Sequence, residues 1–257
     1  MGRQYASKGL LKQALSSYDF AIICDYEFIG AYFEMGKTLQ RMKRYNEAIL
    51  AFETTLSIDE PTAFALLHIG LCHIELGNTK LAIQYFKKTL NEDPLYAKAW
   101  VALIDAYRDN KDYEKALYYA KKSIQIDNVN ATTWKKYAEI NFTLGFFEEA
   151  DLGFEECVNL GNYEVDTWVK WADVLKEMHD YPRAIEVLQH GLEFHTESSV
   201  INFRLGGIYL LSSQSLEARF YLKNAYLADE KQLNHFYETF PQFKSSSFVK
   251  QSLSLKV

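Results

Sequence analysis

The chain has 257 residues and a formal net charge of −6, with 48% apolar and 24% charged residues; this is the composition of a folded globular chain and not of a disordered one. Its 12 glycines and 4 prolines are few, which argues against a loop-rich all-β fold, because such folds need many turn residues. The acidic balance argues against nucleic acid as the main partner, because contacts with phosphates need a basic surface.

Cysteine usage and the absence of long apolar runs restrict the compartment. Cys24, Cys72 and Cys157 are far apart in the sequence, so neither a disulfide framework nor a zinc site is predicted, and a reducing compartment fits best. Residues 1–6 contain no apolar signal-peptide core. A membrane span needs at least about 18 consecutive apolar residues, and no such run occurs. We therefore predict a cytoplasmic protein with no membrane partner.

A strict internal repeat runs along the whole chain. Seven alanines are separated by 34 residues each, with no insertion: Ala14, Ala48, Ala82, Ala116, Ala150, Ala184 and Ala218. Tryptophan recurs in the same register at Trp100, Trp134 and Trp168. Self-similarity at a fixed period of this size predicts stacked supersecondary units, because one unit cannot bury its apolar face alone.

Each unit is predicted to be a pair of antiparallel helices. In the unit that begins at residue 97, apolar residues three and four apart form two stripes, one from Trp100 to Tyr107 and one from Ala116 to Ser123, around a polar turn at 109–112. A small residue, often glycine, recurs where the two backbones approach, and we expect the alanine of the second helix to face it. Ile104 is bulky at this position, so we expect a local shift of that helix pair.

These motifs resemble those of the tetratricopeptide repeat family. The unit that begins at residue 63 carries the signature positions at Leu66, Ile69, Gly70, His73, Ala82, Phe86 and Pro94. The resemblance implies an all-α, right-handed α-solenoid of antiparallel helix pairs with a C-terminal capping segment. The predicted organisation is an array over residues 1–232, made of a partial first repeat, 1–28, and repeats 29–62, 63–96, 97–130, 131–164, 165–198 and 199–232, followed by capping helices and a tail at 233–257.

The two ends of the array differ. The first unit lacks most of its first helix, and we favour a fragment of a longer array over a chain that begins there naturally. The edge helix at 11–24 is apolar; it is either covered by a short stub at 1–8 or left as a sticky edge. At the other end, Leu233, Phe236, Tyr237 and Phe240 form one helical face that ends at Pro241, and a last helix is predicted at 248–253. We interpret this segment as a cap, with docking on a partner as the alternative.

No catalytic constellation is found. The six histidines form neither an HExxH motif nor a metal cluster, and no GxSxG, GxGxxG or phosphate-binding glycine loop occurs. Cys72 and Cys157 are interpreted as small buried apolar residues. We predict no enzyme activity, no catalytic residue, no metal and no cofactor.

The resemblance also implies a concave groove lined by the first helix of each pair. The residues predicted to face it are Phe64, Leu67, His68, Leu71, Lys98, Lys135, Lys136, Lys170 and Arg204.

Two groups of side chains on this predicted surface each have a functional and a structural interpretation. Phe64, Leu67, Leu71 and Ile74 form either an exposed apolar patch or a face that the second helix buries. Lys136, Lys170 and Arg204, with Lys135 beside them, form either a basic ladder for an acidic ligand or a ladder neutralised by Glu139, Asp166 and Asp173.

The leading functional hypothesis is a non-catalytic scaffold that binds a peptide or protein segment in the groove. The alternative is an assembly module that self-associates through its N-terminal edge or convex face, with a homodimer as one form. A third hypothesis, the scaffold part of an enzyme, finds no support in these residues. The carboxylate clamp with which some family members hold chaperone C-termini is matched only at Lys135 and Arg204, and Glu139 would repel a carboxylate, so no chaperone co-receptor is predicted.

Overall fold

A computed structural model of the chain describes residues 1–58 and 62–254. Of these residues 81% are helical and none lies in a strand, which confirms the all-α prediction. Residues 59–61, at the end of the predicted repeat 29–62, and residues 255–257, at the end of the predicted tail, lie outside the described part.

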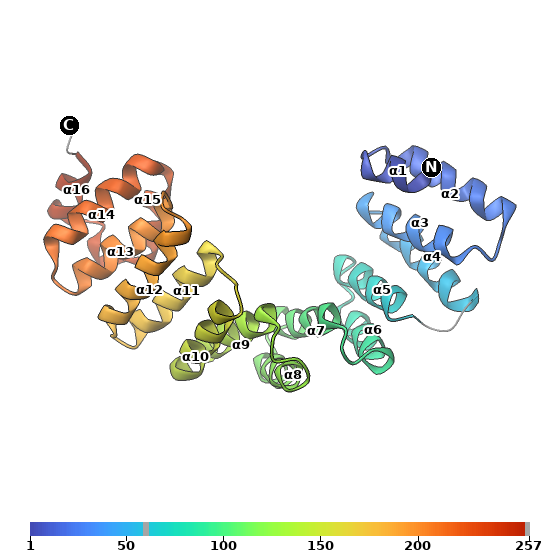
Figure 1. Cartoon of the computed structure of the whole chain (residues 1–257), viewed down its shortest axis with the longest axis horizontal. Helices are drawn as coiled ribbons and strands as arrows, with labels where there is room; N and C mark the ends of the chain where they lie inside the picture. Colours follow the sequence, from blue (N-terminus) through green and yellow to red (C-terminus); the bar gives the residue numbers. More distant parts are fainter. Residues whose placement is uncertain (59–61, 255–257) are drawn as a thin grey trace. The chain divides into compact units, whose positions relative to one another are not determined.

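The chain divides into two compact units, Met1–Asn128 and Val129–Val257. In each unit the helices follow one another in pairs, and consecutive helices pack together (Figure 1). Unit 1 contains α1 (Gly2–Ser7), α2 (Leu11–Cys24), α3 (Ile29–Arg41), α4 (Tyr45–Ile58), α5 (Ala63–Glu75), α6 (Thr79–Glu92), α7 (Ala97–Asp109) and α8 (Tyr113–Ile126). Unit 2 contains α9 (Ala131–Leu144), α10 (Phe147–Asn159), α11 (Val165–Glu177), α12 (Tyr181–Phe194), α13 (Ser199–Leu211), α14 (Ser215–Ala228), α15 (Leu233–Thr239) and α16 (Ser247–Ser254).

The turn inside each helix pair uses one backbone conformation at one repeat position. The residue there has a positive φ, between 60° and 80°, in seven pairs: Gly9, Lys43, Gly77, Lys111, Gly145, His179 and Ser213. These residues are again 34 apart, and the left-handed conformation reverses the chain between the two helices. Glycine adopts this conformation without steric cost, whereas lysine, histidine and serine do so at about 1 kcal/mol each. No single residue type marks this position in the sequence, because only some of its residues are glycine.

Where the small residue of the first helix is glycine, the atoms nearest to an added β-carbon belong to a large side chain of the second helix, and not to its alanine as expected. A β-carbon on Gly36 would lie 2.6 Å from the ring of Phe52, and one on Gly70 would lie 2.5 Å from the ring of Phe86. In the unit that begins at residue 97 the sizes are reversed. Ile104 stands at the repeat position of Gly70, and Ala120 stands at the repeat position of Phe86; both are fully buried. A large side chain on the first helix is thus matched by a small one on the second.

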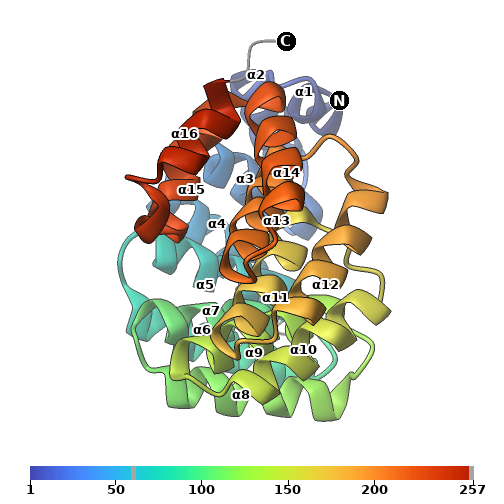
Figure 2. The same ribbon diagram turned by 90° about the vertical axis from the view of Figure 1, so that its left-hand side faces the viewer.

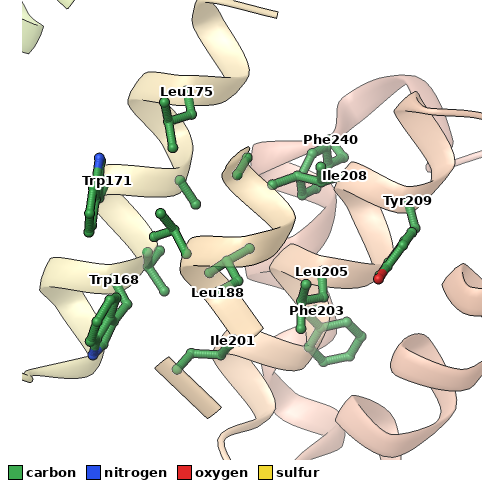
Figure 3. Close-up of a cluster of buried hydrophobic side chains, with 14 of the residues drawn as sticks. Trp168, Trp171, Leu175, Leu188, Ile201, Phe203, Leu205, Ile208, Tyr209 and Phe240 are labelled. Carbon is green, nitrogen blue, oxygen red and sulfur yellow. The ribbon is translucent and has the colours of Figure 1, made fainter. Parts of the chain in front are cut away.

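The C-terminal segment closes unit 2, as predicted. Helix α15 packs on α13, and α16 packs on α14 (Figure 2). The 3-10 turns Glu230–Gln232 and Pro241–Phe243 flank α15. Phe236 and Phe240 are each 1% exposed and belong to the core of unit 2, where Phe240 lies near Ile208 of α13 (Figure 3).

Candidate functional site

The predicted groove residues fall into two sets, one in each unit. Phe64, Leu67, His68, Leu71 and Lys98 belong to unit 1; Lys135, Lys136, Lys170 and Arg204 belong to unit 2. Each set is described by itself.

The apolar patch of unit 1 is smaller than predicted, because not all of the residues predicted for it are exposed. Phe64 is 58% exposed and its ring meets that of Tyr96 edge-on at 5.1 Å. Leu71 is half-buried. Leu67 is only 3% exposed, so its placement on an exposed patch is wrong, and the alternative of burial within the unit applies to it. Phe64 with Tyr96 is therefore the apolar anchor that this face offers.

His68 is the centre of this face. Its Nδ1–H donates to Gln40 Oε1 at 2.7 Å, and Gln40 Nε2 donates to the His68 carbonyl oxygen and to Cys72 Sγ. The imidazole stacks on Phe52 with the ring centroids 5.2 Å apart and meets Phe33 edge-on. These contacts join α3 to α5 and hold the ring in one orientation.

Two lysines lie close enough to His68 to act on its charge. Burial, which has the largest effect, and the positive charges of Lys37 and Lys98 together lower the pKa of His68 to about 4, against the opposing effect of Glu34. The imidazole is therefore neutral at pH 7. Lys98 is exposed, and the Lys37 side chain is 42% exposed and bonded to Glu34. We call the surface formed by Lys37, Phe64, His68 and Lys98 the first-helix face of unit 1.

The pKa of His68 predicts a dependence of stability on pH. Below about pH 6.5 the unfolded chain protonates this histidine while the folded chain does not, so stability falls as the pH drops from about 6.5 to 4 and then levels off. The loss is at most about 3 kcal/mol, since part of the ring is open to solvent. A His68→Gln variant should lose less stability over this range in urea unfolding at several pH values. An NMR titration of His68 with a midpoint near 6.5 would contradict the prediction.

The basic ladder of unit 2 is neutralised. Lys170 Nζ lies 2.7 Å from Glu139 and 2.9 Å from Asp166, and Lys135 Nζ lies 2.7 Å from Glu164 and 2.9 Å from Asp166. Burial disfavours the charge of Lys170, but the hydrogen bonds from Glu139 and Asp166 outweigh it and its pKa is raised. Lys136 is half-buried and also takes part in an interaction. Of the two alternatives for this ladder, the neutralised one holds.

Arg204 is not an accessible cation. It is 7% exposed, and its guanidinium lies 3.2 Å from Asp173 Oδ2, whose side chain is 16% exposed. Burial lowers the pKa of Arg204, while burial raises the pKa of Asp173 against the pull of Arg204 and Lys176. The prediction that Arg204 faces a ligand is therefore wrong for the chain as described, because the side chain is part of a buried ion pair.

The chain's own C-terminal segment covers this ion pair. The ring of Phe240 lies 5.9 Å from the Arg204 guanidinium and 5.6 Å from Lys176 Nζ. A β-carbon on Gly207 would collide with the ring of Phe240, so the glycine makes room for it. Arg204 was predicted to line the groove and the C-terminal segment was predicted to be a cap, but the placement of this cap over Arg204 was not predicted. The adjacent glycines 206 and 207 were the available signal.

The described residues were also compared with what a cysteine nucleophile, a metal site and a membrane span require. Cys72 and Cys157 are buried, and burial raises the pKa of these thiols to about 11 and about 12, so both are poor nucleophiles. Residues 1–58 and 62–254 contain no group of three or more His, Cys, Asp or Glu side chains that could hold a metal ion. Every helix in the same residues is too short or too polar to cross a lipid bilayer.

Successive helix pairs that recur every 34 residues, with the turn of each pair in the same backbone conformation, define an α-helical repeat protein. The family model described as tetratricopeptide repeat matches residues 33–94 and 74–131. The 34-residue register of these matches continues through unit 2. Residues 33–131 therefore match the tetratricopeptide repeat, and the chain as a whole has the fold of a tetratricopeptide repeat solenoid.

Individual relatives share the fold but little sequence. A segment of 108 residues is 28% identical to the Protein CTR9 homolog of Arabidopsis thaliana; it covers 40% of this chain and spans only 10% of that protein. The crystal structure of the C-terminal part of a TPR repeat-containing protein from Cytophaga hutchinsonii superposes with a TM-score of 0.75 at 13% identity, over 99% of this chain and 98% of that one. YrrB, described as a TPR protein with an unusual peptide-binding site, has a TM-score of 0.50 at 19% identity, over 62% of this chain and 82% of that one.

Proposed function

We propose that this chain is a non-catalytic scaffold that binds an extended segment of another protein on the first-helix face of unit 1. The fold points to a protein–protein interaction scaffold. The observation that supports this particular face is the meeting of an exposed aromatic ring, Phe64, with the cations Lys37 and Lys98 around a neutral, fixed His68.

The chemistry of the face suggests the chemistry of the ligand. An apolar side chain would pack on Phe64 and Tyr96, and a carboxylate would pair with Lys98, which is exposed. The segment we propose therefore carries an acidic residue close to a large apolar one. The peptide-binding site in the printed description of YrrB is in keeping with this use of the fold. We expect neither nucleic acid nor a membrane as partner, and we expect a reducing compartment such as the cytoplasm.

The equivalent surface of unit 2 is less suited to a ligand. Its lysines already bridge carboxylates on α9 and α11, and its Arg204 lies beneath Phe240. A ligand would first have to displace these contacts, which reduces the affinity available to it.

Linear peptides selected from a random phage-displayed library against the whole chain test this proposal. Phe64→Ala and Lys98→Glu should each weaken the selected peptides about tenfold or more in calorimetry, and the Lys98→Glu effect should shrink at high salt because it is electrostatic. The control is Lys80→Glu, which reverses an exposed lysine on α6. If the selected peptides bind Phe64→Ala and Lys98→Glu as tightly as the unaltered chain, this face is not the binding site.

A second candidate, self-association through the N-terminal edge of unit 1, is favoured by a hollow there. Helix α1 covers α2 only in part: Tyr18 is buried below Gly2, but a depression of about 510 Å³ remains between α1, α2 and α3. Phe28, at its rim, is 50% exposed, and Ile23 of α2 is 82% exposed. Such apolar surface is typical of contacts between chains.

If this edge joins two copies, the mass measured by sedimentation should rise with concentration toward a dimer, and Phe28→Asp should keep the chain monomeric. The control is Phe220→Asp, which alters a phenylalanine of α14 that is 59% exposed. A monomer at all concentrations would exclude the edge as a self-association surface.

A further inference from the structure

Unit 2 contains a hollow that the predicted groove does not include. It has a volume of about 610 Å³ and lies between the C-terminal end of α12 and the helices α13 and α14. Its lining includes Leu192 and Tyr221 as apolar walls and Asn202 of α13. The volume is in the range of ligand-binding pockets, which hold roughly 300–1,000 Å³.

The preceding repeat shows what normally fills this place. There, Tyr163 and Phe194 stack on each other at 4.3 Å, and the ring of Trp168, which is 2% exposed, lies 6.4 Å from the first and 6.0 Å from the second. The residues 34 positions later are Glu197, Asn202 and Ala228, and all three line the hollow. An aromatic stack is thus replaced by three smaller or polar residues, and the space it would occupy stays open.

A third repeat shows how an indole is held at this position. Trp100 Nε1 donates to the carbonyl oxygen of Pro94 at 2.7 Å, and its ring lies 6.3 Å from that of Tyr119. The corresponding residues of the hollow, 102 positions later, are Thr196 and Tyr221. Both are present in its lining, so the hollow keeps an aromatic wall and a residue at the repeat position of the acceptor, while the tryptophan itself is absent.

The rim of the hollow has the character of a protein-binding surface. Phe220 is 59% exposed and Leu227 is 70% exposed, and both line it. At the repeat position of Leu227 the two previous repeats carry the polar residues Asn159 and Glu193. Exposed apolar side chains beside a cavity are typical of interaction sites.

We propose that this hollow is a binding pocket for a tryptophan side chain of a partner protein, which inserts its indole where the repeat lacks its own. The ring would stack on Tyr221, and the indole N–H would donate to the carbonyl oxygen of Thr196, as Trp100 does to Pro94. The partner is a different protein and not a second copy, because Trp100, Trp168 and Trp171 are each at most 8% exposed and Trp134 is half-buried.

The test uses N-acetyltryptophanamide and a short peptide with one tryptophan, titrated into the ¹⁵N-labelled whole chain. We expect saturable NMR shifts at Asn202, Tyr221 and Asn224, with a dissociation constant of the order of 1 mM for the amide and a tighter one for the peptide. Asn202→Trp fills the pocket from within and should weaken binding at least tenfold, while Asn46→Trp, on an exposed site of α4, should leave it unchanged. Circular dichroism checks that each variant is folded.

Should Asn202→Trp not fold, Phe220→Asp at the exposed rim should still weaken the peptide several-fold. The proposal is overturned if no saturable shift occurs, if Asn202→Trp binds like the unaltered chain, or if N-acetylphenylalaninamide binds as well as the tryptophan amide. A concentration-dependent dimer that Asn202→Trp abolishes would overturn the assignment to a different partner. The Phe64→Ala variant should bind these probes normally, so failure here and failure of the proposed function remain distinct.

Discussion

Asp173→Asn should lower the free energy of unfolding of unit 2 by about 3–5 kcal/mol. The substitution keeps the shape of the side chain but leaves the Arg204 guanidinium buried without its counter-charge, and Arg204 is only 7% exposed. Urea unfolding followed by tryptophan fluorescence measures the effect, because Trp134, Trp168 and Trp171 all lie in unit 2.

Two further variants identify the cause. Replacing both partners, Asp173→Leu with Arg204→Met, should recover most of the lost stability, because no unpaired charge is then buried. Removing one partner of the exposed pair Arg44–Glu47, whose side chains are 44% and 52% exposed, should cost less than about 1 kcal/mol. A loss for Asp173→Asn as small as that of the exposed pair would show that water reaches Arg204.

Phe240→Ala should lower the stability of unit 2 by about 3–5 kcal/mol and release the C-terminal segment from α13. The ring is 1% exposed and fills the space above Gly207, where no other side chain of α13 can replace it. Hydrogen exchange should show faster exchange of the amides of α15 and a smaller change in α11. Phe220→Ala is the matched control: its ring is 59% exposed, so the cost should stay below about 1 kcal/mol.

The two effects should not add. Phe240 lies over the Arg204 guanidinium, so its removal lets water reach the ion pair and lowers the cost of an unpaired charge. The double variant Asp173→Asn with Phe240→Ala should therefore lose less stability than the two single variants together, by about 1 kcal/mol or more. Strict additivity would mean that the segment does not shield the pair.

Charge reversal at Lys170 does not test ligand binding alone. From sequence, charge reversal at Lys170 is a test of ligand binding. In the structure Lys170 joins Glu139 of α9 to Asp166 of α11, so reversal places three carboxylates together and lowers stability whether or not a ligand binds there. Lys98, which is exposed, is the better residue for testing binding.

Spacing along the sequence determined the helices of this protein. Apolar residues three and four apart select helices, and a 34-residue register without insertions spaces the helix pairs evenly, so the helices near Trp100 and Ala116 and the C-terminal helix before Pro241 were all predictable. These properties are local, since they depend on neighbours within one or two turns.

Which side chains remain accessible was decided by tertiary structure, because accessibility depends on neighbours far away in the sequence. Leu67 and Arg204 occupy the same kind of helix position as Phe64 and Lys98, yet packing buries the first two and leaves the others open. Arg204 is covered by a residue 36 positions later, Phe240, and no local pattern states where that segment folds back. The hollow at Asn202 likewise exists because α12, α13 and α14 surround a position that lacks its tryptophan.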